Sequence, residues 1–178
     1  YVGNAQPSSV YTDTYSEAQD ILKAEAPKAT NGLAIAINNA NEGNVARLFS
    51  SVKFDYSTWF TDNEVSNSYI KKTISTTTPG SEILGYNNTA IIEKVGESYN
   101  EAQTGSGEFM TILTAFRTAN EVSSNCSKWY LPSYAELKQI QDNYATIEAS
   151  IQKANGTLAQ FSDFATNTTD KFYWSSDL

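Results

Sequence analysis

The stretch WYLPSYAEL, residues 129–137, marks the place where an extended segment turns into a helix. Ser133 is a favoured helix N-cap, and Glu136 follows it at the spacing of a capping box. In that motif the serine side chain accepts from the Glu136 amide, and the glutamate accepts from the Ser133 amide. Pro132 restricts Leu131 to extended geometry. The sequence therefore predicts a strand ending near Leu131 and a helix starting after Ser133.

An apolar stripe follows this turn and predicts a helix that is buried along one face. Its members, which recur at spacings of three and four, are Leu137, Ile140, Tyr144, Ile147 and Ile151. Asn143 is a point where the segment can divide into two helices. Gly156 suits the C′ position that ends a helix.

The N-terminal part of the chain is expected to hold one helix and one strand. Thr14 and Glu17 have capping-box spacing, and the helix that they start should end before Pro27. Residues 33–37 (LAIAI) form a short apolar run between two turn-rich segments. The shortness of this run and its bounding turns favour a buried strand over a helix.

Two more helices are expected in the middle of the chain. Asn88 or Thr89 should cap a helix that runs through Val95 and is ended by Gly96. A second, stronger helical pattern consists of Phe109, Ile112, Leu113 and Phe116.

Composition excludes several function classes. The 178 residues fit one domain, which we place over 1–178. The absence of histidine rules out histidine-based triads and metal sites, and the single cysteine rules out an internal disulfide. A net charge of −8 without a Lys/Arg cluster argues against nucleic acid, and no apolar run is long enough to insert into a membrane. We expect an extracellular or outer-cell-surface location, reached after removal of a targeting segment.

Four motifs, in this order, resemble the signature of a bacterial surface-domain family. That family includes the C-terminal domain of the Legionella collagen-like adhesin and the major paralogous domain of Fibrobacter. The motifs are NGLAIAI at 31–37, GYNNT at 85–89, WYLPSYAEL at 129–137 and YWSS at 173–176. Their fold-signature residues are Gly32, Leu33, Asn88, Thr89, Trp129, Leu131, Pro132, Ser133, Glu136, Leu137, Tyr173, Trp174, Ser175 and Ser176.

The resemblance implies an α+β, C-type-lectin-like fold, distantly similar to the formylglycine-generating enzymes. Such a fold has a small twisted antiparallel sheet, two main helices and long loops. The family continues beyond its YWSS motif with further strands, so we expect this domain either to lack the family's terminal strands or to close differently. The family's Trp129 and Trp174 strands face the long helix, which makes both indoles part of the framework.

Each residue with reactive or stacking chemistry also has a structural explanation. Glu136 is better explained by the capping box than by catalysis. Cys126 lacks both an imidazole base and a second thiol, so we expect no catalytic role. Trp129 and Trp174 are expected to pack rather than to stack on sugars, whereas Trp59 suits either role. No calcium-binding pattern is present, and we expect neither a metal nor a cofactor.

We therefore predict a non-enzymatic extracellular ligand-binding or adhesion module of a bacterial surface protein. Its partner would be a glycan or protein ligand at the cell surface, held by the polar loops at 66–81 and 157–169. One alternative is a structural or tip subunit of a surface appendage. Others are an enzyme distantly related to the formylglycine-generating group and a receptor with hypervariable surface residues.

Overall fold

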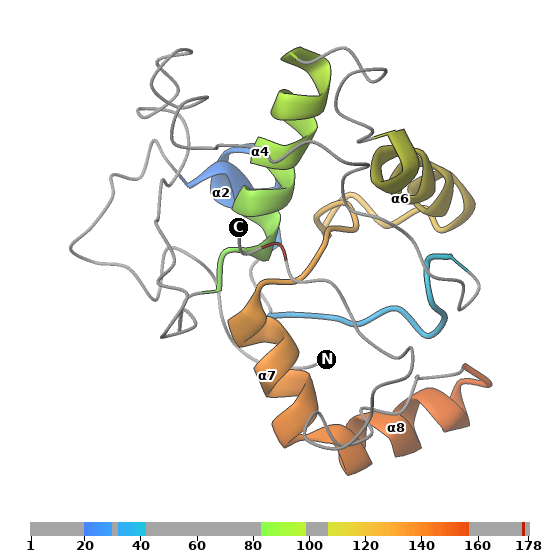
Figure 1. The fold of residues 1–178 in the computed structure, drawn as a ribbon. Helices are drawn as coiled ribbons and strands as arrows, with labels where there is room; N and C mark the ends of the chain where they lie inside the picture. The colour runs from blue at the N-terminus through green and yellow to red at the C-terminus, as the bar shows by residue number, and fades with distance from the viewer. Residues whose placement is uncertain (1–19, 30–31, 42–82, 99–106, 157–175, 177–178) are drawn as a thin grey trace, which may run out of the picture.

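The computed structural model describes residues 20–29, 32–41, 83–98, 107–156 and 176. Five helices lie within these ranges (Figure 1). They are α2 (Ile21–Glu25), α4 (Gly85–Ser98), α6 (Gly107–Ala119), α7 (Tyr134–Asp142) and α8 (Tyr144–Lys153). The predictions for Thr14, Glu17, Trp59, residues 66–81 and residues 157–175 lie outside the described residues.

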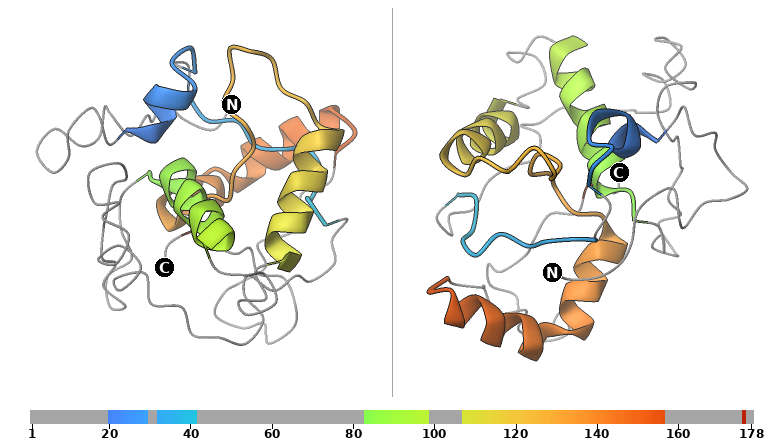
Figure 2. Two further views of the ribbon diagram at one scale, coloured as in Figure 1. Left: turned by 90° about the horizontal axis from the view of Figure 1, so that it is seen from above. Right: turned by 180° about the vertical axis from the view of Figure 1, so that it is seen from behind.

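Helix α4 occupies the centre of the described structure. It lies between α2 and α6 and contacts both (Figures 1 and 2). Helix α7 starts near the first turn of α4 and leads into α8, while residues 32–41 pass between α6 and α8 in both figures. Among the described residues, the segment 83–92 supplies more than half of the buried apolar side chains, namely Ile83, Leu84, Tyr86, Ala90, Ile91 and Ile92. The core therefore lies along the first half of α4.

The expected α+β fold with a twisted antiparallel sheet is wrong for the part of the chain that the structure describes. Those residues form helices and extended segments without a sheet, so they do not form the C-type-lectin-like fold that the resemblance implied. Residues 33–36 are extended with one isolated bridge at Leu33, and Ile37 lies in a bend. Residues 129–133 are extended without forming a strand.

Side chains take the place of a neighbouring strand along this second segment. The carbonyl of Trp129 accepts from Arg117 Nε at 2.7 Å, and both backbone polar groups of Leu131 bond to the Thr89 hydroxyl. The carbonyl of Pro132 accepts from the amide of Ser176 at 2.7 Å. Because these groups are satisfied by α4, α6 and Ser176, the segment needs no β-ladder.

The apolar stripe after Ser133 forms two helices, as the sequence allowed. Asn143 ends α7 and precedes α8, so the division that the sequence allowed at this residue is present. Ile140, Ile147 and Ile151 are buried together, with Ile35 and Leu137 packed against them. The extended segment that carries Ile35 is thus anchored on the inner side of the two helices.

The end of α8 differs from the prediction by one residue. Asn155, rather than Gly156, is the C′ residue, with a left-handed φ of 57°. Its amide donates to Gln152 O at 3.0 Å, and the Gly156 amide donates to Ile151 O at 2.9 Å, which together form a Schellman motif. Gly156 is needed for a different reason: a Cβ there would meet Ile37 Cβ at 2.7 Å and Ile151 Cγ2 at 2.9 Å.

Helix α4 also starts earlier and ends later than expected. It begins at Gly85 and runs past Gly96 to Ser98, so the predicted start at Asn88 or Thr89 and the predicted stop at Gly96 are wrong. The amide of Asn88 already donates to Leu84 O at 2.8 Å, which makes Leu84 the residue before the first turn. Thr89 therefore lies inside the helix, where its side chain is available for a tertiary contact.

The remaining helices agree with the sequence where they are described. The pattern that begins at Phe109 forms α6, and α2 ends at Glu25, before Pro27 as expected. Helix α2 is capped by Asp20, which is almost fully buried and accepts from the Lys23 amide at 3.0 Å.

Candidate functional site

The predicted capping box is present at the start of α7. The Glu136 amide donates to Ser133 Oγ at 3.4 Å, and the Ser133 amide donates to Glu136 Oε2 at 2.6 Å. The backbone of Ser133 is extended, with φ −72° and ψ 167°, as an N-cap requires. Both side chains are buried, at 0% and 4% exposed. The cap therefore lies in the interior rather than on the surface.

The second carboxylate oxygen of Glu136 has its own partner. Tyr130 donates its hydroxyl proton to Glu136 Oε1 at 3.0 Å. Burial, the negative charge of Glu136 and this hydrogen bond all raise the pKa of Tyr130 well above its ordinary value. The tyrosine therefore stays a neutral donor, and both oxygens of Glu136 are occupied by structural hydrogen bonds.

Helix α4 approaches this carboxylate through a glycine. A Cβ atom at Gly85 would overlap Glu136 Oε2, and it would meet Tyr130 Cε2 at 2.7 Å and Leu131 O at 2.8 Å. The first turn of α4 thus packs directly on the cap of α7. One turn later on α4, Thr89 bonds to Leu131, so Gly85 and Thr89 hold the same segment. We call Gly85, Thr89, Tyr130, Ser133 and Glu136 the buried junction.

Charged side chains surround the outer side of the junction. Lys128 Nζ lies 3.4 Å from Glu25 Oε2 and 3.2 Å from Glu93 Oε2, and Arg117 pairs with Glu93 Oε1. Lys128 also lies over the ring of Tyr86, 5.9 Å from its centroid. These pairs connect α2, α4 and α6 to the segment that enters the junction. Because Lys128 and Glu25 are substantially exposed, we expect little stabilisation from their pair.

Tyr86 links the charged groups to the junction. Its hydroxyl donates to Glu25 Oε2 at 2.6 Å, and its ring meets the Tyr130 ring edge-on, with 5.6 Å between centroids. Burial is the main cause that raises the pKa of Tyr86, and the hydrogen bond to Glu25 adds to it. Both tyrosines are therefore fixed in the neutral form by their surroundings.

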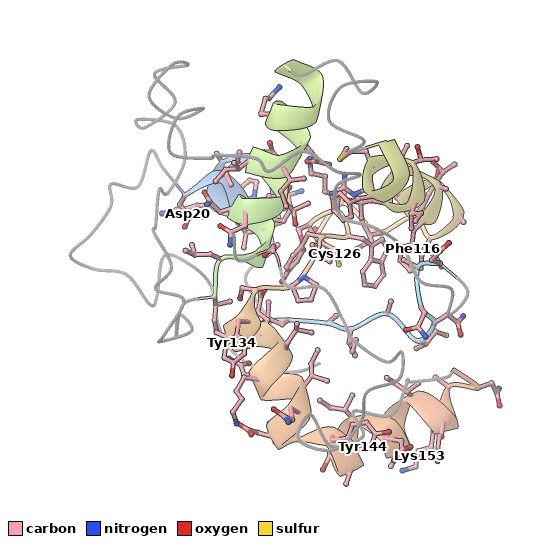
Figure 3. All side chains as sticks on the ribbon, viewed as in Figure 1. Asp20, Phe116, Cys126, Tyr134, Tyr144 and Lys153 are labelled. Atoms are coloured by element: carbon pink, nitrogen blue, oxygen red, sulfur yellow. The ribbon has the colours of Figure 1, made fainter. Side chains whose placement is uncertain are left out.

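Trp129 is half-buried beside the junction. Its indole N–H donates to Asn120 O at 2.7 Å, and its ring meets Phe116 edge-on at 5.7 Å between centroids. The indole thereby holds the end of the exposed loop between α6 and α7 against the start of that loop at Asn120. Cys126 lies in that loop (Figure 3), exposed and 3.5 Å from Ser123 Oγ.

The described fold-signature residues lie partly at the junction and partly outside it. Thr89, Leu131, Pro132, Ser133, Glu136 and Ser176 meet at or beside the junction, and Trp129 lies next to them. Gly32, with φ 107°, and Leu33 lie in the extended segment, and Leu137 packs on the α7–α8 cluster. Asn88 is half-buried in the first turn of α4. Tyr173, Trp174 and Ser175 lie outside the described residues.

Sequence reasoning missed the residues that complete the junction. Gly85 belongs to the GYNNT motif and Tyr130 to a predicted strand, and neither position by itself indicates a tertiary contact. Arg117, Glu93 and Lys128 carried no local signal, because their partners lie 12 to 103 residues away in the chain. The S-x-x-E spacing was the one local feature that pointed to the junction.

The arrangement is suited to holding segments together rather than to proton transfer. The carboxylate and the tyrosine that could act as acid and base are bonded to one another and to a backbone amide. Among the described residues, no three His, Cys, Asp or Glu side chains come together as a metal site. No helix in the described ranges is long and apolar enough to cross a bilayer.

A relative with a surface-appendage name aligns along almost the whole chain. The chain is 25% identical, over 192 aligned positions, to a Bacteroides ovatus protein named "Putative fimbrium tip subunit Fim1C". The alignment covers 99% of this chain and 33% of that protein, so the chain spans about a third of the relative's length. No family model and no solved structure matches the chain. The similarity thus points to a surface protein.

Proposed function

We propose that this chain is part of the tip subunit of a bacterial surface appendage, with a non-enzymatic binding role. The observation that carries the proposal is its similarity to the Bacteroides ovatus protein over 99% of the chain. A location at the outer cell surface follows from the same proposal.

The buried junction supports a non-enzymatic role. Both oxygens of Glu136 accept hydrogen bonds that hold the start of α7, and Thr89 holds Leu131. A catalytic carboxylate needs a free oxygen within reach of a substrate proton. Glu136 is 4% exposed and thus acts as a framework residue. This arrangement favours a scaffold that carries binding loops over the enzyme alternative.

Electron microscopy of the producing cells tests the location. We would label the cells with antibodies raised against this chain and with gold-conjugated secondary antibodies. The proposal expects gold at the free ends of appendages. Gold along the shafts would indicate a stalk subunit, and gold on the cell body alone would overturn the proposal. A strain in which the gene is deleted provides the control for antibody specificity.

A second experiment tests the binding role. We propose a glycan or a surface protein as the ligand, because a tip subunit is the part of an appendage that meets other surfaces. The purified chain would be applied to arrayed glycans and to host-surface proteins, with heat-unfolded chain as the control. Saturable binding that unfolding abolishes is expected. If the chain binds saturably to neither array, the adhesion role is contradicted. The location at the tip is tested separately, by the electron microscopy.

A further inference from the structure

The C-terminal cap of α8 contains a chemically labile pair of residues. Asn155 is exposed and is followed by Gly156. Glycine has no side chain to shield its amide nitrogen, so that nitrogen can reach the side-chain carbonyl of a preceding asparagine. In an unfolded chain this pair is a site of spontaneous deamidation.

The fold places both residues under restraint. The amide of Gly156 donates to Ile151 O at 2.9 Å, and the amide of Asn155 donates to Gln152 O at 3.0 Å. Asn155 is held at φ 57°, and Gly156 is packed tightly against Ile37 and Ile151. The nitrogen that would react is therefore hydrogen-bonded and held in place.

We propose that Asn155 is a deamidation site whose reactivity is gated by opening of the α8 cap. In the reaction the Gly156 nitrogen loses its proton to a solvent base and attacks the side-chain carbonyl carbon of Asn155. A new nitrogen–carbon bond forms, and ammonia leaves with the side-chain nitrogen. Water then opens the succinimide at one of its two carbonyls, which gives aspartate or isoaspartate. One water is consumed and one ammonia released, without any redox change.

The reaction would prevent the cap from closing again. Isoaspartate inserts an additional backbone carbon between the Cα of residue 155 and the Gly156 amide, so the hydrogen bond from that amide to Ile151 O no longer fits its spacing. The new carboxylate also lies at a helix C-terminus, where negative charge is unfavourable. The contact between Gly156 and Ile37 would be lost with the cap. This inference concerns the chain itself and does not depend on the proposed function.

Peptide mapping by mass spectrometry tests the gate. The purified chain would be incubated at mildly alkaline pH, both folded and unfolded in urea, and the peptide that contains Asn155 followed over time. Because only the open fraction reacts, we expect deamidation in the folded chain to be at least ~10-fold slower. Equal rates in the folded and unfolded chains would overturn the proposal.

Two matched variants locate the gate at the cap. Gln152 and Gln141 are both exposed helical glutamines, in the last turn of α8 and in α7 respectively. Glycine at either position loosens a helix by a similar amount. The gate predicts faster deamidation of folded Gln152→Gly and an unchanged rate in Gln141→Gly. Equal acceleration in both variants, or none in Gln152→Gly, would contradict local gating.

Discussion

The hydroxyl of Thr89 satisfies both backbone polar groups of Leu131. It accepts from the Leu131 amide at 2.9 Å and donates to the Leu131 carbonyl at 3.2 Å. Thr89 is 1% exposed, so water cannot replace it. A single side chain on α4 thus does for Leu131 what a neighbouring strand does in a sheet.

Thr89→Val should therefore destabilise the fold. Valine keeps the shape of threonine but leaves the two Leu131 groups unsatisfied, which should cost about 2–4 kcal/mol. Urea unfolding followed by circular dichroism measures the difference. Thr118→Val is the control, because that exposed hydroxyl bonds only to Thr114 O and its loss should stay within about 0.5 kcal/mol. Equal effects in the two variants would refute the role given to Thr89.

Removing the capping box should also lower stability. Ser133→Ala should cost about 1 kcal/mol, as for a typical N-cap. Glu136→Ala should cost more, about 2–4 kcal/mol, because it leaves the Ser133 amide and the Tyr130 hydroxyl without their acceptors. Thermal unfolding of both variants provides the comparison. Ser150→Ala, an exposed helical serine, is the control, and a larger loss there than in Ser133→Ala would count against the cap.

The change in stability caused by Gly85→Ala should have the opposite sign to the usual effect of replacing a helical glycine by alanine. Alanine in place of glycine normally stabilises a helix by about 0.5–1 kcal/mol. At Gly85 the added carbon would overlap Glu136 Oε2, so we expect a net loss of about 1–3 kcal/mol. Ala115→Gly, on the exposed side of α6, measures the helix propensity term alone. A more stable Gly85→Ala chain would show that α4 and α7 do not meet as described.

Alkaline pH should unfold the chain through its two buried tyrosines. The folded pKa values of Tyr130 and Tyr86 are raised, so the neutral forms are favoured by folding. Their contribution to stability is fully present below the ordinary pKa of about 10 and is lost as the pH rises above it. Denaturant midpoints from neutral to strongly alkaline pH measure this loss.

Phenylalanine variants of the two tyrosines are the control for the measurement of stability at alkaline pH. Tyr130→Phe removes one of the two hydroxyls whose pKa is raised in the folded chain, so its stability should fall less steeply with pH than that of the unmodified chain. The double variant with Tyr86→Phe should be flatter still. Identical slopes in all three chains would mean that these hydroxyls are not the groups that titrate.

Local features of the fold could be predicted from the sequence, and long-range ones could not. The capping box and the break at Asn143 depend on residues within one or two helical turns, and both are present. The predicted strand at Leu131 was wrong. A residue before a proline is extended whether a neighbouring strand or side chains satisfy its backbone polar groups, and the sequence does not distinguish the two cases. The threonine that satisfies Leu131 lies 42 residues earlier in the chain.

The same distinction between local and long-range features applies to the residues of the buried junction. Ser133 and Glu136 could be found by their spacing, whereas Gly85 could not, because its need for glycine arises from a carboxylate on another helix. The sequence predicts a helix cap at Asn88 or Thr89, but the helix starts at Gly85. Arg117 and Lys128 gave no local pattern, since each pairs with groups on other elements.

The packing of Gly85 on Glu136 has a consequence for how this sequence can diverge. The two positions share one volume, so a larger residue at 85 requires a shorter side chain at 136. A shorter residue at 136 would in turn leave the hydroxyl at position 130 without its acceptor. Substitutions at positions 85, 130 and 136 should therefore appear together among related chains. A lineage that changes one of them first passes through a less stable intermediate.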